Sequence, residues 1–71
     1  MIEYTIVLTW DDEAQVWVAV NDDIPIALNS PSLDELMERV RLAVPEMLEM
    51  NGKPHEGIPL HFKADRVVVA A

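Results

Sequence analysis

The stretch that decides the fold is IEYTIVLTWDDEAQVWVAV, residues 2–20. Apolar and polar residues alternate over residues 2–10, which is typical of a β-strand with one buried face. The acidic segment 11–15 is polar enough to turn, and a second run of β-branched and aromatic residues follows over 16–20. We therefore predict a β-hairpin with a loop of about five residues.

The register of this hairpin determines which side chains share a face, because directly opposite residues lie on the same side of a sheet. We expect Trp10 to pair with Val16. One face of the hairpin then carries Ile6, Leu8, Trp10, Val16, Val18 and Val20. The opposite face carries Val7, Thr9, Trp17 and Ala19.

A third strand is predicted over Ile24–Leu28, where Pro25 restricts it to an edge or an irregular start. A helix should begin near Ser32, because Ser32 and Glu35 have the spacing of a capping box. Apolar residues then recur every three or four positions and form one stripe along the helix, made of Leu33, Leu36, Met37, Val40, Ala43, Val44 and Met47.

Pro45 lies within this periodic run, so we expect a kink or a break of the helix there. Asn51-Gly52 is typical of a left-handed helix end. Alternation resumes over residues 58–65, and Val67–Val69 continue after a change of phase near Arg66, which predicts a last strand with a bulge or bend.

The predicted architecture is a single α+β domain over residues 1–71 with the element order β-β-β-α-β. A right-handed crossover brings the last strand beside the first. We therefore expect a mainly antiparallel sheet with the strand order 3-2-1-4 and one helix packed on one face.

Composition restricts the classes of function. Thirteen acidic and five basic residues give a net charge of -8, which disfavours direct binding of nucleic acid and favours a small basic protein partner. No run approaches the roughly 20 apolar residues that cross a bilayer, and the start of the chain lacks the pattern of a signal peptide. With no cysteine, a thiolate metal site is excluded, and we expect a cytoplasmic protein. A core this small favours self-association as a source of stability.

Four segments together resemble the stand-alone HicB-like domains of prokaryotes, a short family of unknown function related to HicB antitoxins. They are WDDEAQVWVA (10–19), DDIP (22–25), SLDEL (32–36) and VPEMLEMN (44–51). The resemblance covers nearly the whole chain and implies a degenerate ribonuclease-H-like β-β-β-α-β fold. It also implies the partner-binding half of an antitoxin, which occludes a small basic toxin-like protein, without the DNA-binding segment. Ile26 stands where the family usually has glycine, so the third strand is expected to begin differently.

The carboxylates do not form an obvious catalytic set. Glu3 lies at one end of the first strand and Asp11 and Asp12 at the other, whereas a metal-dependent nuclease needs its acids together. His55 and His61 have no clustered acid or serine and are expected in a loop and on a strand surface. We therefore predict a protein that is not an enzyme and has no cofactor, with a metal-dependent nuclease as a remote alternative.

Interface candidates come from charge and from exposed apolar residues. The acidic turns contribute Asp11, Asp12, Glu13, Asp22 and Asp23, which either receive basic side chains of a partner or serve only solubility. Trp17 is a candidate if it lies opposite the helix; otherwise an error in the pairing leaves it in the core. Val67 and Val69 form an edge-strand candidate for a homodimer or larger homo-oligomer. The alternative function is a self-assembling structural or adaptor domain.

Overall fold

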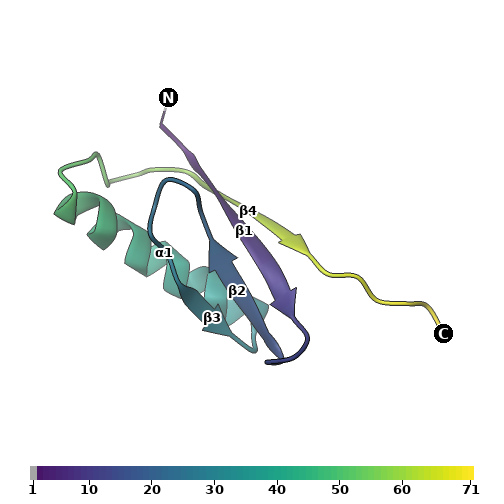
Figure 1. The fold of residues 1–71 in the computed structure, drawn as a ribbon. Helices are drawn as coiled ribbons and strands as arrows, with labels where there is room; N and C mark the ends of the chain where they lie inside the picture. The colour runs from purple at the N-terminus through teal and green to yellow at the C-terminus, as the bar shows by residue number, and fades with distance from the viewer. Residues whose placement is uncertain (1) are drawn as a thin grey trace.

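The computed structural model describes residues 2–71. Along the chain it contains β1 (Tyr4–Asp11), β2 (Val16–Val20), β3 (Leu28–Ser30), α1 (Leu33–Met50) and β4 (Leu60–Asp65), as Figure 1 shows. The strands form one mixed sheet in the order β3-β2-β1-β4, in which β1 is antiparallel to β2 and parallel to β4. The predicted α+β class, strand order and single helix are therefore confirmed.

The hairpin register differs from the prediction by one residue. Asp11 pairs with Val16, and Trp10 pairs with Trp17. Asp11 is still part of β1, and Gln15 closes the turn with a positive φ of 57°, so the loop is shorter than expected. Since a shift of one residue moves a whole strand to the other face, the predicted composition of both faces is wrong.

The segment before β3 is not the predicted strand. Asn21 Oδ1 accepts hydrogen bonds from the backbone N–H groups of Asp23 (2.7 Å) and Ile24 (2.8 Å), and Ile26 N–H donates to the Ile24 carbonyl at 2.7 Å. These tight turns around Pro25 direct Ile24 and Ile26 into the core, where both are buried. Strand pairing therefore starts only at Leu28.

Helix α1 begins and ends where its sequence predicts, although the Ser32 N–H donates to Ser30 Oγ at 3.1 Å and not to the Glu35 side chain of a full capping box. Ser32 is the N-cap, and its hydroxyl accepts a hydrogen bond from Glu35 N–H at 3.3 Å. At the other end Gly52 has a φ of 67°, and Lys53 N–H donates to the Leu48 carbonyl at 2.9 Å. This backbone bond is part of the usual glycine-dependent helix stop.

Pro45 lies inside α1, which continues through it, so of the two predicted effects of this proline, a kink or a break, the break is wrong. Its ring is half-buried, and its neighbour Val44 belongs to the core. Proline removes one helical N–H donor, but burial of Val44 and Leu48 on either side favours a continuous helix. The helix therefore runs unbroken to Met50 (Figure 1).

The last strand is shorter than predicted. β4 ends at Asp65, which pairs with Thr9 near the end of β1. Residues 66–71 form neither the expected bulge nor a continued strand, and they run away from the body of the molecule as an extended tail (Figure 1).

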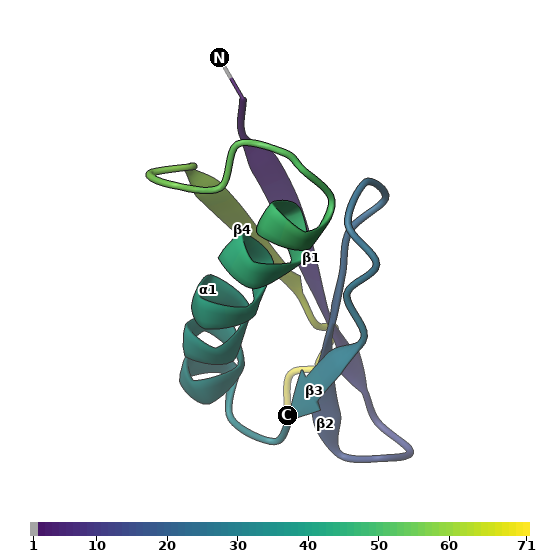
Figure 2. The ribbon, with the colours of Figure 1, turned by 90° about the vertical axis from the view of Figure 1, so that its left-hand side faces the viewer.

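The core lies between α1 and the one face of the sheet that this helix covers (Figure 2). Its buried apolar residues come from both layers and from the loop before β3. They are Ile6, Leu8, Ala19, Ile24, Ile26, Leu36, Val40, Val44 and Leu48. The buried stripe of α1 is thus the predicted one, extended by Leu48.

Candidate protein-binding face

Four valines lie on the face of the sheet that α1 does not cover. Val7 comes from β1, and Val16, Val18 and Val20 come from β2, where the observed register places them opposite Asp11, Thr9 and Val7. The exposed fractions of Val7 and Val20 are 39% and 45%, and Val16 and Val18 are half-buried. We call these four residues the valine face. Apolar residues grouped on an open surface commonly mark an interaction site.

Polar residues of β4 border the valine face on one side. His61, Lys63 and Asp65 pair with Thr5, Val7 and Thr9, so they share the open side of the sheet. His61 Nε2 lies 3.0 Å from Glu3 Oε2 and forms an ion pair with it when the imidazole is protonated. The border therefore contains charges of both signs next to the valines.

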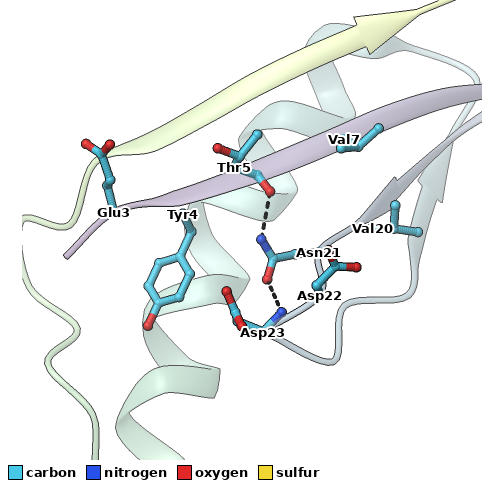
Figure 3. Close-up of a pocket in the computed structure, with 8 residues that line it drawn as sticks. All are labelled: Glu3, Tyr4, Thr5, Val7, Val20, Asn21, Asp22 and Asp23. Atoms are coloured by element: carbon cyan, nitrogen blue, oxygen red, sulfur yellow. Dashed lines mark hydrogen bonds between the residues drawn. The ribbon is translucent and has the colours of Figure 1, made fainter.

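An acidic pocket of about 330 Å³ adjoins the valine face at the start of β1 (Figure 3). Asn21 closes it from the end of β2, because its side-chain N–H donates to the Thr5 carbonyl at 2.7 Å. Apolar and acidic groups both line the pocket, which contains Glu3, Tyr4, Thr5, Val7, Val20, Asn21, Asp22 and Asp23. Carboxylates beside aliphatic surface suit the charged head and apolar stem of a lysine or arginine.

The other acidic turn lies at the opposite end of β2 and is organised by its own hydrogen bonds. Asp11 Oδ1 accepts from the backbone N–H groups of Glu13 and Ala14, both at 3.1 Å. Asp12 Oδ1 accepts from the Trp10 indole N–H at 3.2 Å. Asp11 and Asp12 thus shape the hairpin, and the structure does not bring Asp11, Asp12 and Glu13 together with Asp22 and Asp23.

Trp17 is not on the open face, so its predicted place opposite the helix is wrong. It pairs with Trp10, is half-buried and packs against the core. The two indole rings meet edge to face, with centroids 5.5 Å apart and an interplanar angle of 65°. The observed position is the other alternative, in which the predicted strand pairing is wrong and Trp17 lies on the core side.

Sequence reasoning missed three of the valines, because it placed Val16, Val18 and Val20 on the same face as the core residues Ile6 and Leu8. Asp11 is the residue of the sequence that could have indicated the observed register. Aspartate is favoured at the first position of a type I turn, where its side chain bonds to backbone N–H groups two and three residues later. A turn that starts at Asp11 leaves this residue paired with Val16 at the end of the hairpin, which gives the observed register.

The tail residues Val67 and Val69 are 87% and 88% exposed. Just before them, the Arg66 guanidinium lies 3.9 Å from the centroid of the Trp10 ring. This cation–π contact holds the start of the tail against the end of β1. The tail candidates are therefore on the surface, but they extend from the sheet and do not form its edge.

Comparison with known proteins places this structure in a family. A family model described as a domain of unknown function, DUF1902, matches residues 3–70. The chain belongs to the DUF1902 family. It is also similar to the crystal structure of the hypothetical protein TTHA1013 from the extremely thermophilic bacterium Thermus thermophilus, with 38% identity and a TM-score of 0.80 over 97% of this chain and 100% of that one. No curated protein matches.

Two features are absent from the part of this DUF1902 chain that the structure describes, a metal-binding cluster and a membrane-spanning helix. Within residues 2–71, no group of three or more histidine, cysteine or acidic side chains is placed to hold a metal ion. Over the same residues, no helix has the length and apolar content to span a membrane.

Proposed function

We infer that this member of the DUF1902 family is a non-catalytic protein-binding module that occludes a small basic partner, as the HicB-like resemblance suggests. The observation that carries the proposal is the valine face. Its valines lie on the side of the sheet opposite the only helix of residues 2–71, and burial of such a surface is the main driving force of protein association.

Charge supports a basic partner. The chain has a net charge of -8, and the acidic pocket continues the valine face at the start of β1. Opposite charges speed encounter and orient the partner, whereas the apolar centre supplies affinity. Asp22 and Asp23 are the acidic candidates that this arrangement favours, because they adjoin the valines.

The test uses two matched lysine substitutions and one defined probe. The probe is a small basic protein encoded by a reading frame adjacent to that of this chain, co-expressed with it. Val20→Lys places a positive charge on the valine face, and Leu42→Lys places the same charge on the outer side of α1, where Leu42 is 58% exposed. Circular dichroism and thermal unfolding check that both variants fold.

We expect the basic protein to co-purify with the wild type and with Leu42→Lys, to be lost with Val20→Lys, and to bind more weakly at high salt. Binding that survives Val20→Lys would show that the valine face is not the interface. No co-purification with the wild-type chain would contradict the proposal and favour the self-assembling alternative.

A further inference from the structure

The outer edge of the sheet next to β4 offers a second interaction surface, separate from the valine face. Within residues 2–71, β4 is an edge strand paired only with β1, so one side of its backbone is unpaired over Leu60–Asp65. Unpaired strand edges with no proline readily pair with another strand. An incoming strand can therefore extend the sheet here without covering the valines.

An apolar groove runs beside this edge on the helix side. A pocket of about 370 Å³ separates α1 from β4, and its lining is apolar except for one arginine. The lining residues are Arg41, Val44, Pro45, Gly57, Ile58, Leu60 and Phe62. The open pocket shows that α1 does not fill the space beside β4, so an apolar side chain from a neighbouring strand can enter it.

The tail provides apolar side chains that match the apolar pocket beside β4. Residues 66–71 read RVVVAA and continue directly from β4. Val67, Val68 and Val69 are 87%, 73% and 88% exposed, and β-branched residues of this kind favour strands. The cation–π contact of Arg66 with Trp10 fixes where the tail leaves the body.

We propose that β4 and the tail pair with the same segment of a second copy of this chain, antiparallel across a two-fold axis. This two-fold axis is perpendicular to the sheet, so residues that pair between the two copies lie on the same face. The axis passes beside one residue, which pairs with the same residue of the second copy. The two sheets then join into one, with both helices on one side and both valine faces on the other.

Among axes at the last three residues of β4, charge favours one register. An axis at Lys63 or at Asp65 places two like charges opposite each other, which is destabilising. An axis at Ala64 places Lys63 of each copy opposite Asp65 of the other, so that two ion pairs flank a small residue. In this register Val68 lies opposite Leu60 of the second copy, beside the apolar pocket that Leu60 lines.

The first test is the oligomeric state, measured by sedimentation velocity from low to high micromolar concentration. We expect a reversible dimer for the wild-type chain and loss of the dimer after deletion of residues 66–71. The deleted residues are exposed, so thermal unfolding of the monomer should change only by the small effect of losing the cation–π contact between Arg66 and Trp10. A wild-type chain that stays monomeric, or a dimer that survives the deletion, would overturn the proposal.

Charge reversal tests the register. Lys63→Asp alone and Asp65→Lys alone each place like charges opposite each other and should weaken the dimer, whereas the double variant Lys63→Asp/Asp65→Lys should restore it. Failure of the double variant to recover the dimer while its fold is intact would exclude the Ala64 axis.

Cross-linking gives a direct distance test, because the chain has no cysteine of its own. Ala64→Cys lies on the axis and should form an intermolecular disulfide under mild oxidation, since opposite Cα atoms are close enough for one. Ala70→Cys is the control: its two copies are roughly 40 Å apart by strand rise in this register. Equal cross-linking of both variants would show random collision and contradict the model.

The dimer and the proposed partner binding fail independently. A chain without residues 66–71 should still bind the basic partner through the valine face, and Val20→Lys should still form the dimer.

Discussion

The two faces of this sheet carry similar side chains but have different surroundings. On one face Ile6, Leu8 and Ala19 are completely buried beneath α1. On the other face Val7 and Val20, from the same two strands, are 39% and 45% exposed. Hydrophobicity therefore does not distinguish the core from the open surface here; coverage by the helix does. An apolar face without cover is a surface available to another protein.

The largest expected difference compares adjacent residues of β1. Ile6→Ala should lower the free energy of unfolding by about 2–5 kcal/mol through lost burial and a cavity, whereas Val7→Ala should cost less than about 1 kcal/mol. Urea unfolding followed by circular dichroism, at one fixed protein concentration, measures both. Because a domain this small has only about 3–5 kcal/mol of stability, Ile6→Val, expected to cost about 0.5–1.5 kcal/mol, keeps the comparison measurable. Equal effects at both positions would mean that the faces do not differ.

A second comparison tests the hairpin register. Trp17 packs on the core side against Trp10, so Trp17→Ala should cost about 1–3 kcal/mol. Val18→Ala, on the valine face, should cost less than about 1 kcal/mol. The same urea unfolding experiment applies. The register predicted from the sequence reverses the ranking, so a larger loss at Val18 would contradict the observed pairing.

The sequence was sufficient for the strand order and for both ends of the helix, because each depends on local chemistry or on a general rule. Ser32 and Gly52 act through their own backbone neighbours, and β4 lies beside β1 as the rule of right-handed crossovers predicts. The faces of β2 could not be assigned in the same way. Val16, Val18 and Val20 alternate with Trp17 and Ala19, so both halves of the pattern are apolar and periodicity permits either one to be buried.

The other errors also concern interactions that periodicity does not describe. Ile24 and Ile26 have the alternation of a strand, but the hydrogen bonds of Asn21 and the tight turn at Pro25 make them a buried loop. Pro45 is a helix breaker locally, yet the residues around it pack into the core. Of the predicted interface residues, Asp22 and Asp23 line the acidic pocket beside the valine face, but Trp17 does not reach it.

A smaller effect tests how firmly the covering helix is anchored. Ser32→Ala removes the hydroxyl that accepts from Glu35 N–H and should cost about 1 kcal/mol. Ser32→Asp keeps an acceptor at the N-cap and should stay close to the wild type. Thermal unfolding of the two variants distinguishes the cap from a general effect of replacing Ser32. If Ser32→Asp loses as much stability as Ser32→Ala, the hydrogen bond is not the cause.

The smallest effect is expected on the outer side of α1, which faces solvent. Arg41 donates to Glu38 at 2.6 and 2.9 Å, and this hydrogen bonding lowers the pKa of the Glu38 carboxyl. A lowered folded-state pKa stabilises the fold above the carboxyl's unfolded pKa, and that contribution is lost as pH falls through the folded value. Glu38→Gln should therefore reduce the melting temperature slightly at neutral pH, relative to the control Glu46→Gln on the same helix. The difference between the two variants should disappear in acid.

Both partners of the pair are more than half exposed, so water and salt screen the attraction. A large fall in melting temperature for Glu38→Gln would mean that the outer side of α1 contributes more to stability than its exposure allows. That result would weaken the contrast between the covered and open faces of the sheet.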